Sequence, residues 1–235
     1  MLFFFSKFAI LVRMKKYIVF LAAAVLAISC SHTEKAPSHP SMIANVDPFL
    51  IGSVNVSLDQ LLSSQLKETA VEIVFYPRQN EVALEWSHNM AQYQQFWDEA
   101  GRQLFVEALN RYNEDFSNKK LTDTYNKSRA VYGKFKGRLL WKTLKFSATY
   151  SSSPFIELGY RFRNNAPYFA TRQMAAKEES GVNKSISESS ASSMYFTRVQ
   201  GEELAKLFDQ AFLLKSLEGK ASSHSADTDR DEYYQ

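Results

Sequence analysis

The sequence predicts an α+β protein in which a mainly antiparallel sheet of about six or seven strands carries two long amphipathic helices on one face. Three observations support this class. Short runs of alternating apolar and polar residues follow one another across compact turns. Two other segments repeat apolar residues at helical spacing, and aromatic residues are frequent while glycine and proline are sparse. A sheet that curls around the C-terminal helix is the alternative architecture.

The first part of the folded region predicts a helix, a hairpin and a second helix. A serine suited to helix capping precedes leucines at helical spacing, which predicts a helix over 57–66. Alternating residues over 71–86, interrupted by a polar turn, predict two paired strands. A pattern that resembles a capping box opens the clearest helix, over 89–112. We expect the pair Asp98–Arg102 on the exposed side of that helix.

The middle of the chain predicts consecutive antiparallel strands. Apolar residues alternate with lysine and arginine over 131–141, and the alternation then changes phase. Because a period-two pattern changes phase only through a bulge or a bend, we expect one near Lys142–Thr143. Further strands are predicted over 156–162 and 168–174.

The last part of the folded region predicts a loop, a strand and a helix. Residues 177–193 are rich in serine, glutamate and lysine and predict a mobile loop within the domain. Residues 194–199 resemble a closing strand, and apolar residues at helical spacing over 204–212 predict the final helix. Gly219 is suited to end that helix.

The N-terminus has the features of a secretory signal. Lys15 and Lys16 precede an apolar run of twelve residues, over 17–28, which ends in small residues before Cys30. This run is shorter than the roughly 20 apolar residues that a membrane-spanning helix needs. Because Met14 directly precedes the two lysines, we expect translation to start there and residues 1–29 to include a short upstream extension.

The segment Ala27-Ile28-Ser29-Cys30 resembles the lipobox of bacterial lipoproteins. This resemblance covers about 30 residues, and it implies that residues 1–29 are removed and that Cys30 carries acyl chains such as palmitate. It also implies a place in the bacterial cell envelope, anchored to the outer membrane on its periplasmic or surface face. Cys30 is the only cysteine, so its lipidation would leave the mature chain without a free thiol. The mature chain resembles no domain family.

Composition divides the mature chain into three parts. Residues 30–43 are polar and contain prolines, which predicts a tether between the lipid and the folded part. Residues 44–219 are long enough for a single α+β domain with its own core. Residues 220–235 are rich in serine and aspartate without apolar periodicity, and they predict a disordered tail.

Positive charge is concentrated in the predicted strands. Residues 1–29 hold four basic residues and no acid, so their removal changes the net charge from +3 to −1 and argues against nucleic-acid binding. Residues 127–172 hold ten basic residues and one acid, Glu157. Their alternation with apolar residues predicts a basic sheet face for an anionic partner, although a solvated face without any partner would give the same pattern. The candidate binding residues are Lys134, Lys136, Arg138, Lys142, Lys145, Arg161 and Arg163.

The sequence carries no catalytic signature. It has no nucleophile elbow and no phosphate-binding glycine loop, and lipidation would consume its only thiol. His88 is the one histidine of the predicted domain, and a lone histidine at a strand end is usually structural. No cluster of histidine and carboxylate residues has metal-ligand spacing, so we expect no metal and no other cofactor. Paired carboxylates of the glycosidase type converge only in three dimensions and have no such signature in a sequence.

These features together predict a non-enzymatic, lipid-anchored envelope protein that docks an anionic partner on its basic face. That partner is an anionic lipid, lipopolysaccharide, a cell-wall polymer or another envelope protein. The first alternative is a carrier with an apolar ligand held between sheet and helices, because aromatic residues crowd the predicted strands. The second alternative is a hydrolase whose site has no sequence signature.

Overall fold

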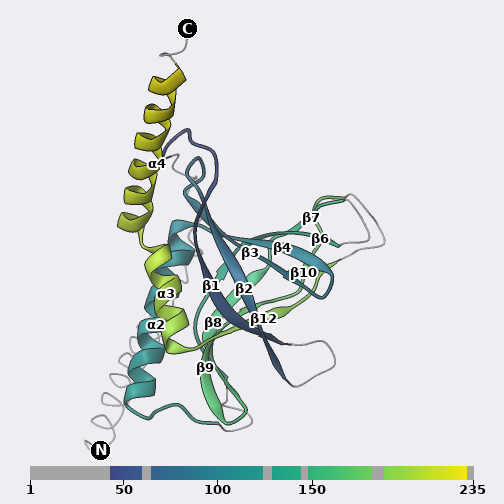
Figure 1. Ribbon diagram of the computed structural model, residues 1–235. Helices are drawn as coiled ribbons and strands as arrows, with labels where there is room; N and C mark the ends of the chain where they lie inside the picture. The colour runs from purple at the N-terminus through teal and green to yellow at the C-terminus, as the bar shows by residue number, and fades with distance from the viewer. Residues whose placement is uncertain (1–42, 60–64, 124–128, 144–147, 182–187, 232–235) are drawn as a thin grey trace, which may run out of the picture. The chain divides into compact units, whose positions relative to one another are not determined.

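One antiparallel sheet of ten strands dominates the computed structural model (Figure 1). The structure describes residues 43–59, 65–123, 129–143, 148–181 and 188–231. The ten strands are β1 (Phe49–Asp59), β2 (Leu66–Tyr76), β3 (Glu81–His88), β4 (Ala91–Trp97), β5 (Arg129–Lys136), β6 (Arg138–Thr143), β7 (Tyr150–Ser152), β8 (Phe155–Arg163), β9 (Ala166–Gln173) and β12 (Ser192–Phe196). Their order in the sheet is β5-β8-β9-β12-β1-β2-β3-β4-β6-β7.

The described part of the chain also contains a small strand pair and three helices. The short strands β10 (Ala176–Lys177) and β11 (Glu188–Ser189) pair with each other, the first at the start of the segment predicted as a mobile loop over 177–193 and the second within it. The helices are α2 (Glu99–Ser117), α3 (Arg198–Phe208) and α4 (Gln210–Asp231). The predicted signal, Cys30 and nearly all of the predicted tether lie outside the described residues.

The α+β class is confirmed, but the predicted sheet of six or seven strands with two long helices is wrong. A curled sheet of ten strands with three helices takes its place. The strands predicted over 71–86, 156–162 and 168–174 correspond to β2 with β3, to β8 and to β9. The difference has two causes. Two segments for which the sequence predicts helices contain parts of β1 and β4, and the antiparallel arms 129–143 and 150–163 are divided into the four strands β5, β6, β7 and β8.

The segment predicted as a helix over 57–66 begins as the end of strand β1. Val54, Val56 and Leu58 are buried in alternation with more exposed neighbours, which is the pattern of a strand with one face in the core. Leu66 opens the next strand and pairs with Asp59. Leu58 and Leu66 therefore lie in two paired strands, and residues 60–64 of the predicted helix lie outside the described residues.

The segment predicted as the start of the clearest helix is strand β4. Asn89 and Met90 adopt positive φ angles of 48° and 60° and turn β3 back into β4. Helix α2 starts only at Glu99, where the Asp98 carboxylate accepts a hydrogen bond from the backbone nitrogen of Gly101 at 2.7 Å. Asp98 is therefore the capping residue of α2, and Arg102 is buried. The predicted pair Asp98–Arg102 on the exposed side of the helix is wrong.

The two ends of the strand order meet at a bend in the chain. Strand β5 runs into β6 with only Gly137 between them, although the two strands lie far apart in the order. The Gly137 backbone nitrogen donates a hydrogen bond to the carbonyl oxygen of Pro154 at 2.9 Å, at the matching junction of β7 and β8. The sheet therefore curls into a half-barrel. The phase change expected near Lys142–Thr143 is replaced by this bend, because β6 pairs regularly with β4 through both residues.

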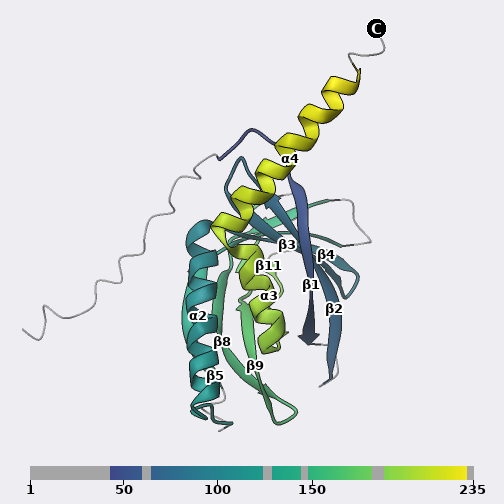
Figure 2. The ribbon, with the colours of Figure 1, turned by 60° about the vertical axis from the view of Figure 1, so that its left-hand side comes forward.

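Helices α2 and α3 lie side by side on the inward face of the curled sheet (Figures 1 and 2). An aromatic cluster fills the space between them and the strands. The Trp97 ring centroid lies 4.7 Å from that of Phe135 and 5.2 Å from that of Phe208, and Phe105 packs on Phe169 at 5.2 Å. Both helices contribute to this core, so the alternative in which the sheet encloses the C-terminal helix alone is also wrong.

Helix α4 continues beyond the predicted stop. Gly219 does not adopt the left-handed conformation of a helix-ending glycine, and the helix runs to Asp231. It therefore enters the segment for which the sequence predicts disorder. Leu213 is the buried apolar residue that α4 contributes to the core among its described side chains.

Candidate functional site

The outward face of the sheet, opposite α2 and α3, carries the basic residues of β5 and β6. Phe135, Leu139 and Trp141 pack inward with the core, and the residues that alternate with them point to the other side. Lys134, Lys136 and Lys142 are exposed, while Lys145 lies outside the described residues. The outward basic residues of these two strands are Lys134, Lys136, Arg138 and Lys142.

The cations on this face differ in how far they are neutralised. The Nη2 of Arg138 lies 2.5 Å from the Glu81 carboxylate, and its guanidinium lies 3.5 Å from the centroid of the Phe96 ring. The Nζ of Lys134 lies 4.3 Å from the Phe155 ring centroid. Among the described residues Lys134 forms no salt bridge, although Glu157 lies opposite it in the pairing of β5 with β8. Within the described part of the chain, Lys136 has no ion pair either.

Arg161 and Arg163 of β8 meet around the hydroxyl of Tyr195. Arg163 donates from Nη2 to the Asp59 Oδ1 at 2.6 Å and to the Tyr195 Oη at 2.7 Å. The Tyr195 hydroxyl donates to the Asp59 Oδ2 at 2.9 Å, and Arg161 donates to the Tyr195 Oη at 3.3 Å. These residues come from β1, β8 and β12, which are adjacent in the curled sheet apart from the intervening β9.

This cluster holds two guanidinium groups and one carboxylate, so it carries an excess positive charge. Partial burial acts to lower the pKa of Arg163, but its hydrogen bond to Tyr195 and the charge of Asp59 raise that pKa above its ordinary value. Arg163 therefore stays protonated at neutral pH. His88 contacts the same strand end, because its Nε2 lies 3.0 Å from the Asp59 carbonyl oxygen.

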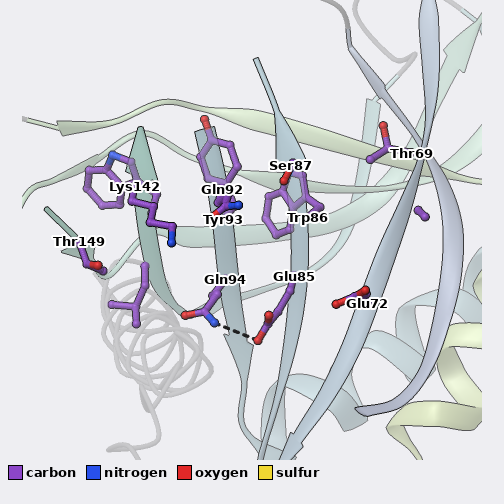
Figure 3. Close-up of a pocket in the computed structure, with 13 residues that line it drawn as sticks. Thr69, Glu72, Glu85, Trp86, Ser87, Gln92, Tyr93, Gln94, Lys142 and Thr149 are labelled. Carbon is purple, nitrogen blue, oxygen red and sulfur yellow. Dashed lines mark hydrogen bonds between the residues drawn. The ribbon is translucent and has the colours of Figure 1, made fainter. Parts of the chain in front are cut away.

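An open groove crosses the outward face of β2, β3, β4 and β6, with a volume of about 560 Å³ (Figure 3). The figure shows Glu72, Glu85, Gln94 and Lys142 on four successive strands. Gln94 donates from Nε2 to the Glu85 Oε1 at 2.9 Å. Of the seven predicted site residues, Lys142 is the one that lines this groove.

Sequence reasoning missed the groove because its residues meet only through strand pairing. Glu72 lies opposite Glu85, Glu85 opposite Gln94, and Gln92 opposite Lys142. The available signal was the run of polar residues in β4, but that segment was assigned to a helix. Correct assignment of the β3–β4 hairpin would have brought Glu85 and Gln94 together from the sequence.

The titratable side chains of the described residues were compared with the arrangement that a metal or catalytic site needs. No three histidine, cysteine or carboxylate side chains of the described chain are grouped closely enough to hold a metal ion. The groove carboxylates Glu72 and Glu85 do not converge with His88, whose ring contacts the Asp59 carbonyl instead. The arrangement is suited to the binding of charged and polar groups.

Fold and site together define an α+β protein with a curled antiparallel sheet, whose outward face combines exposed cations with a polar groove. Residues 49–215, more than half of the chain, match the model of a family described as an uncharacterised Treponema protein, and the chain belongs to this family. The match extends from the start of β1 into α4. No curated protein and no solved structure matches the chain. Among the described residues, no helix combines the length and the apolar character needed to cross a membrane.

Proposed function

We propose that the protein is a non-enzymatic, lipid-anchored binding module of the bacterial cell envelope, which holds an anionic envelope component on its outward face. The exposed lysines of β5 and the arginine pair of β8 on that face carry the proposal. Lys134 and Lys136 are exposed and, within the described chain, have no ion pair. Farther along β8, Arg163 binds the Asp59 carboxylate, and Arg161 donates to the Tyr195 hydroxyl.

The proposed lipid anchor would allow a face with only a few unpaired cations to bind its partner. Lipidation of Cys30 would hold the folded part near the membrane, because an extended tether of residues 30–43 reaches roughly 45 Å. Near an anionic surface each lysine or arginine adds about 1 kcal/mol of binding free energy. A few unpaired cations are then sufficient for docking, since the anchor removes most of the entropic cost of association.

The aromatic cluster favours docking over the carrier alternative. Trp97, Phe105 and Phe208 occupy the space between sheet and helices in which an apolar ligand would lie. The groove on the outward face is lined by carboxylate, amide, hydroxyl and lysine side chains, which suit a polar ligand. No described feature favours the hydrolase, because His88 and the groove carboxylates do not converge.

Charge reversal on β5 tests this function. We expect Lys134→Glu with Lys136→Glu to weaken binding to an anionic envelope component by about 30-fold or more, since two contributions of about 1 kcal/mol each are lost. Binding is measured in three arms: vesicles with and without phosphatidylglycerol, purified lipopolysaccharide, and isolated cell-wall material. The arm that binds the unaltered protein identifies the source of the anionic group.

A matched control uses two lysines on the helices. Lys206 of α3 and Lys215 of α4 are exposed, so Lys206→Glu with Lys215→Glu gives the same change in net charge away from the proposed face. This control should bind like the unaltered protein. The proposal is wrong if both double variants bind equally well, or if the unaltered protein binds none of the three materials.

A further inference from the structure

Two rows of side chains form the floor of the outward groove. The first row is Glu72, Glu85 and Gln94, and the second row is Ser87, Gln92 and Lys142. The rows run across the strands, so the carboxylates gather at the β2–β3 end and the lysine lies at the β6 end. The volume of about 560 Å³ lies within the range of about 300–1,000 Å³ that is typical of ligand pockets.

At the carboxylate end of the groove, two like charges on neighbouring strands destabilise the sheet. Glu72 and Glu85 are direct cross-strand partners, and like charges in that position repel each other. Glu85 accepts hydrogen bonds from Gln94 at 2.9 Å and from the Tyr76 hydroxyl at 3.4 Å. Glu72 is exposed and, among the described residues, has no such partner. A cationic group between the two carboxylates would remove the repulsion and supply hydrogen-bond donors.

The remainder of the groove is suited to hydroxyl groups. It crosses the middle of the sheet, where the backbone groups are already paired in ladders, so a ligand must be recognised by side chains. Gln92 and Gln94 each offer an amide that can both donate and accept. A peptide that adds as a strand needs a free sheet edge instead.

We propose that this groove binds a hydroxyl-rich saccharide that carries a free amine, with the amine between Glu72 and Glu85. The amides of Gln92 and Gln94 then exchange hydrogen bonds with sugar hydroxyls, and Lys142 holds an acceptor oxygen at the other end. The site is separate from the residues that carry the proposed function, because Lys134 and Lys136 do not line it.

Titration calorimetry with two matched probes tests this site on the purified full chain. The probes are a glucosamine trimer, which has free amines, and an N-acetylglucosamine trimer, in which each amine is blocked. The titrations are run at about pH 6, where the sugar amines are charged. We expect the amine-bearing trimer to bind at least about tenfold more tightly, because a charge-assisted hydrogen bond adds about 1.5–3 kcal/mol.

Two variants then assign the preference to the groove. Glu72→Gln with Glu85→Gln should abolish the difference between the two trimers, while Glu107→Gln with Glu114→Gln on the exposed side of α2 should leave it unchanged. The groove variant should fold with an equal or higher melting temperature, because a repulsive pair is removed. It should also keep the anionic binding of the β5 lysines, which distinguishes this site from the proposed function.

Three results would overturn the proposal. The first is that neither trimer binds, or that both bind with equal affinity. The second is that the groove variant keeps the preference for the free amine. The third is that a lysine tripeptide binds as tightly as the amine-bearing trimer, which would indicate recognition of a cation without recognition of a sugar.

Discussion

Arg102 places a guanidinium group inside the protein, with a side chain that is almost completely buried. It donates to the carbonyl oxygens of Asn80 and Trp97 at 2.7 and 3.1 Å, and to the Gln210 Oε1 at 2.6 Å. Burial lowers its pKa to about 10, and the nearby charges of Glu99 and Asp98 oppose that shift only in part. One side chain therefore connects the β2–β3 turn, the start of α2 and the start of α4.

Replacing Arg102 should reveal this connection. We expect Arg102→Met to lower the free energy of unfolding by about 2–4 kcal/mol, because several buried oxygens lose their donor. Urea unfolding followed by tryptophan fluorescence measures the change. The matched control is Arg111→Met, on the exposed side of the same helix, for which we expect a loss of less than about 1 kcal/mol. Equal losses in the two variants would contradict the structural role of Arg102.

The pH dependence of the same pair of proteins tests the buried charge itself. Between pH 10 and the ordinary pKa of a guanidinium group, the unfolded chain binds more protons at Arg102 than the folded protein does. The contribution of Arg102 to the unfolding free energy therefore rises with pH in that window. The stability difference between the unaltered protein and Arg102→Met should widen from about pH 9 to about pH 11. A constant difference would show that the pKa of Arg102 is not lowered in the folded protein.

Among the secondary-structure elements, the alternation of apolar and polar residues predicted a strand correctly where all of its inward residues are apolar. Ile156 and Leu158 of β8 fit that rule, and this strand was assigned correctly. In β4 the inward position Gln95 is a buried amide that donates to the Gln173 Oε1 at 3.0 Å and accepts from the Trp97 indole at 3.1 Å. Its partner lies 78 residues away along the chain, so the sequence could not show that a glutamine would be buried there.

The bend at Gly137 is the feature of the sheet that depends most on a single residue. A Cβ atom at this position would lie 2.6 Å from the Ile156 Cδ1 and 3.5 Å from the Phe96 carbonyl oxygen. We expect Gly137→Ala to lower the free energy of unfolding by about 1–3 kcal/mol through overpacking. Adding Ile156→Val removes the crowded methyl group, so the double variant should be more stable than the sum of the single effects predicts.

A second glycine provides the control for this prediction. Apart from its chain neighbours and the backbone of its own helix, no described atom lies within 4 Å of a Cβ built on Gly219 in α4. Gly219→Ala should therefore leave stability unchanged or raise it by up to about 1 kcal/mol. Thermal and urea unfolding of the four variants measure the comparison. Strict additivity of the changes at Gly137 and Ile156 would show that the two side chains do not compete for the same space.

For the whole molecule, the sequence indicated which residues face outward but not which charges remain unpaired. The alternation of Arg138 and Lys142 with buried residues correctly placed both on the outward face. The acids that neutralise Arg138 and Arg163 lie 57 and 104 residues away along the chain, and strand order alone brings them close. Counting charges along a segment therefore overstated the basic character of that face, and the groove carboxylates were not foreseen for the same reason.

For the whole molecule, the proposed attachment and the proposed docking can be separated by mutation, because Cys30 precedes the folded part and the β5 lysines lie within it. We expect Cys30→Ser to abolish the incorporation of labelled palmitate and to release the protein from membranes, since the chain has no second cysteine to accept an acyl chain. Lys134→Glu with Lys136→Glu should keep the label and the membrane attachment while binding of the anionic partner is lost. Ser31→Ala, next to the proposed acylation site, should change neither property. Palmitate retained by Cys30→Ser would show that the anchor lies elsewhere and that the outward face is brought to its partner by another route.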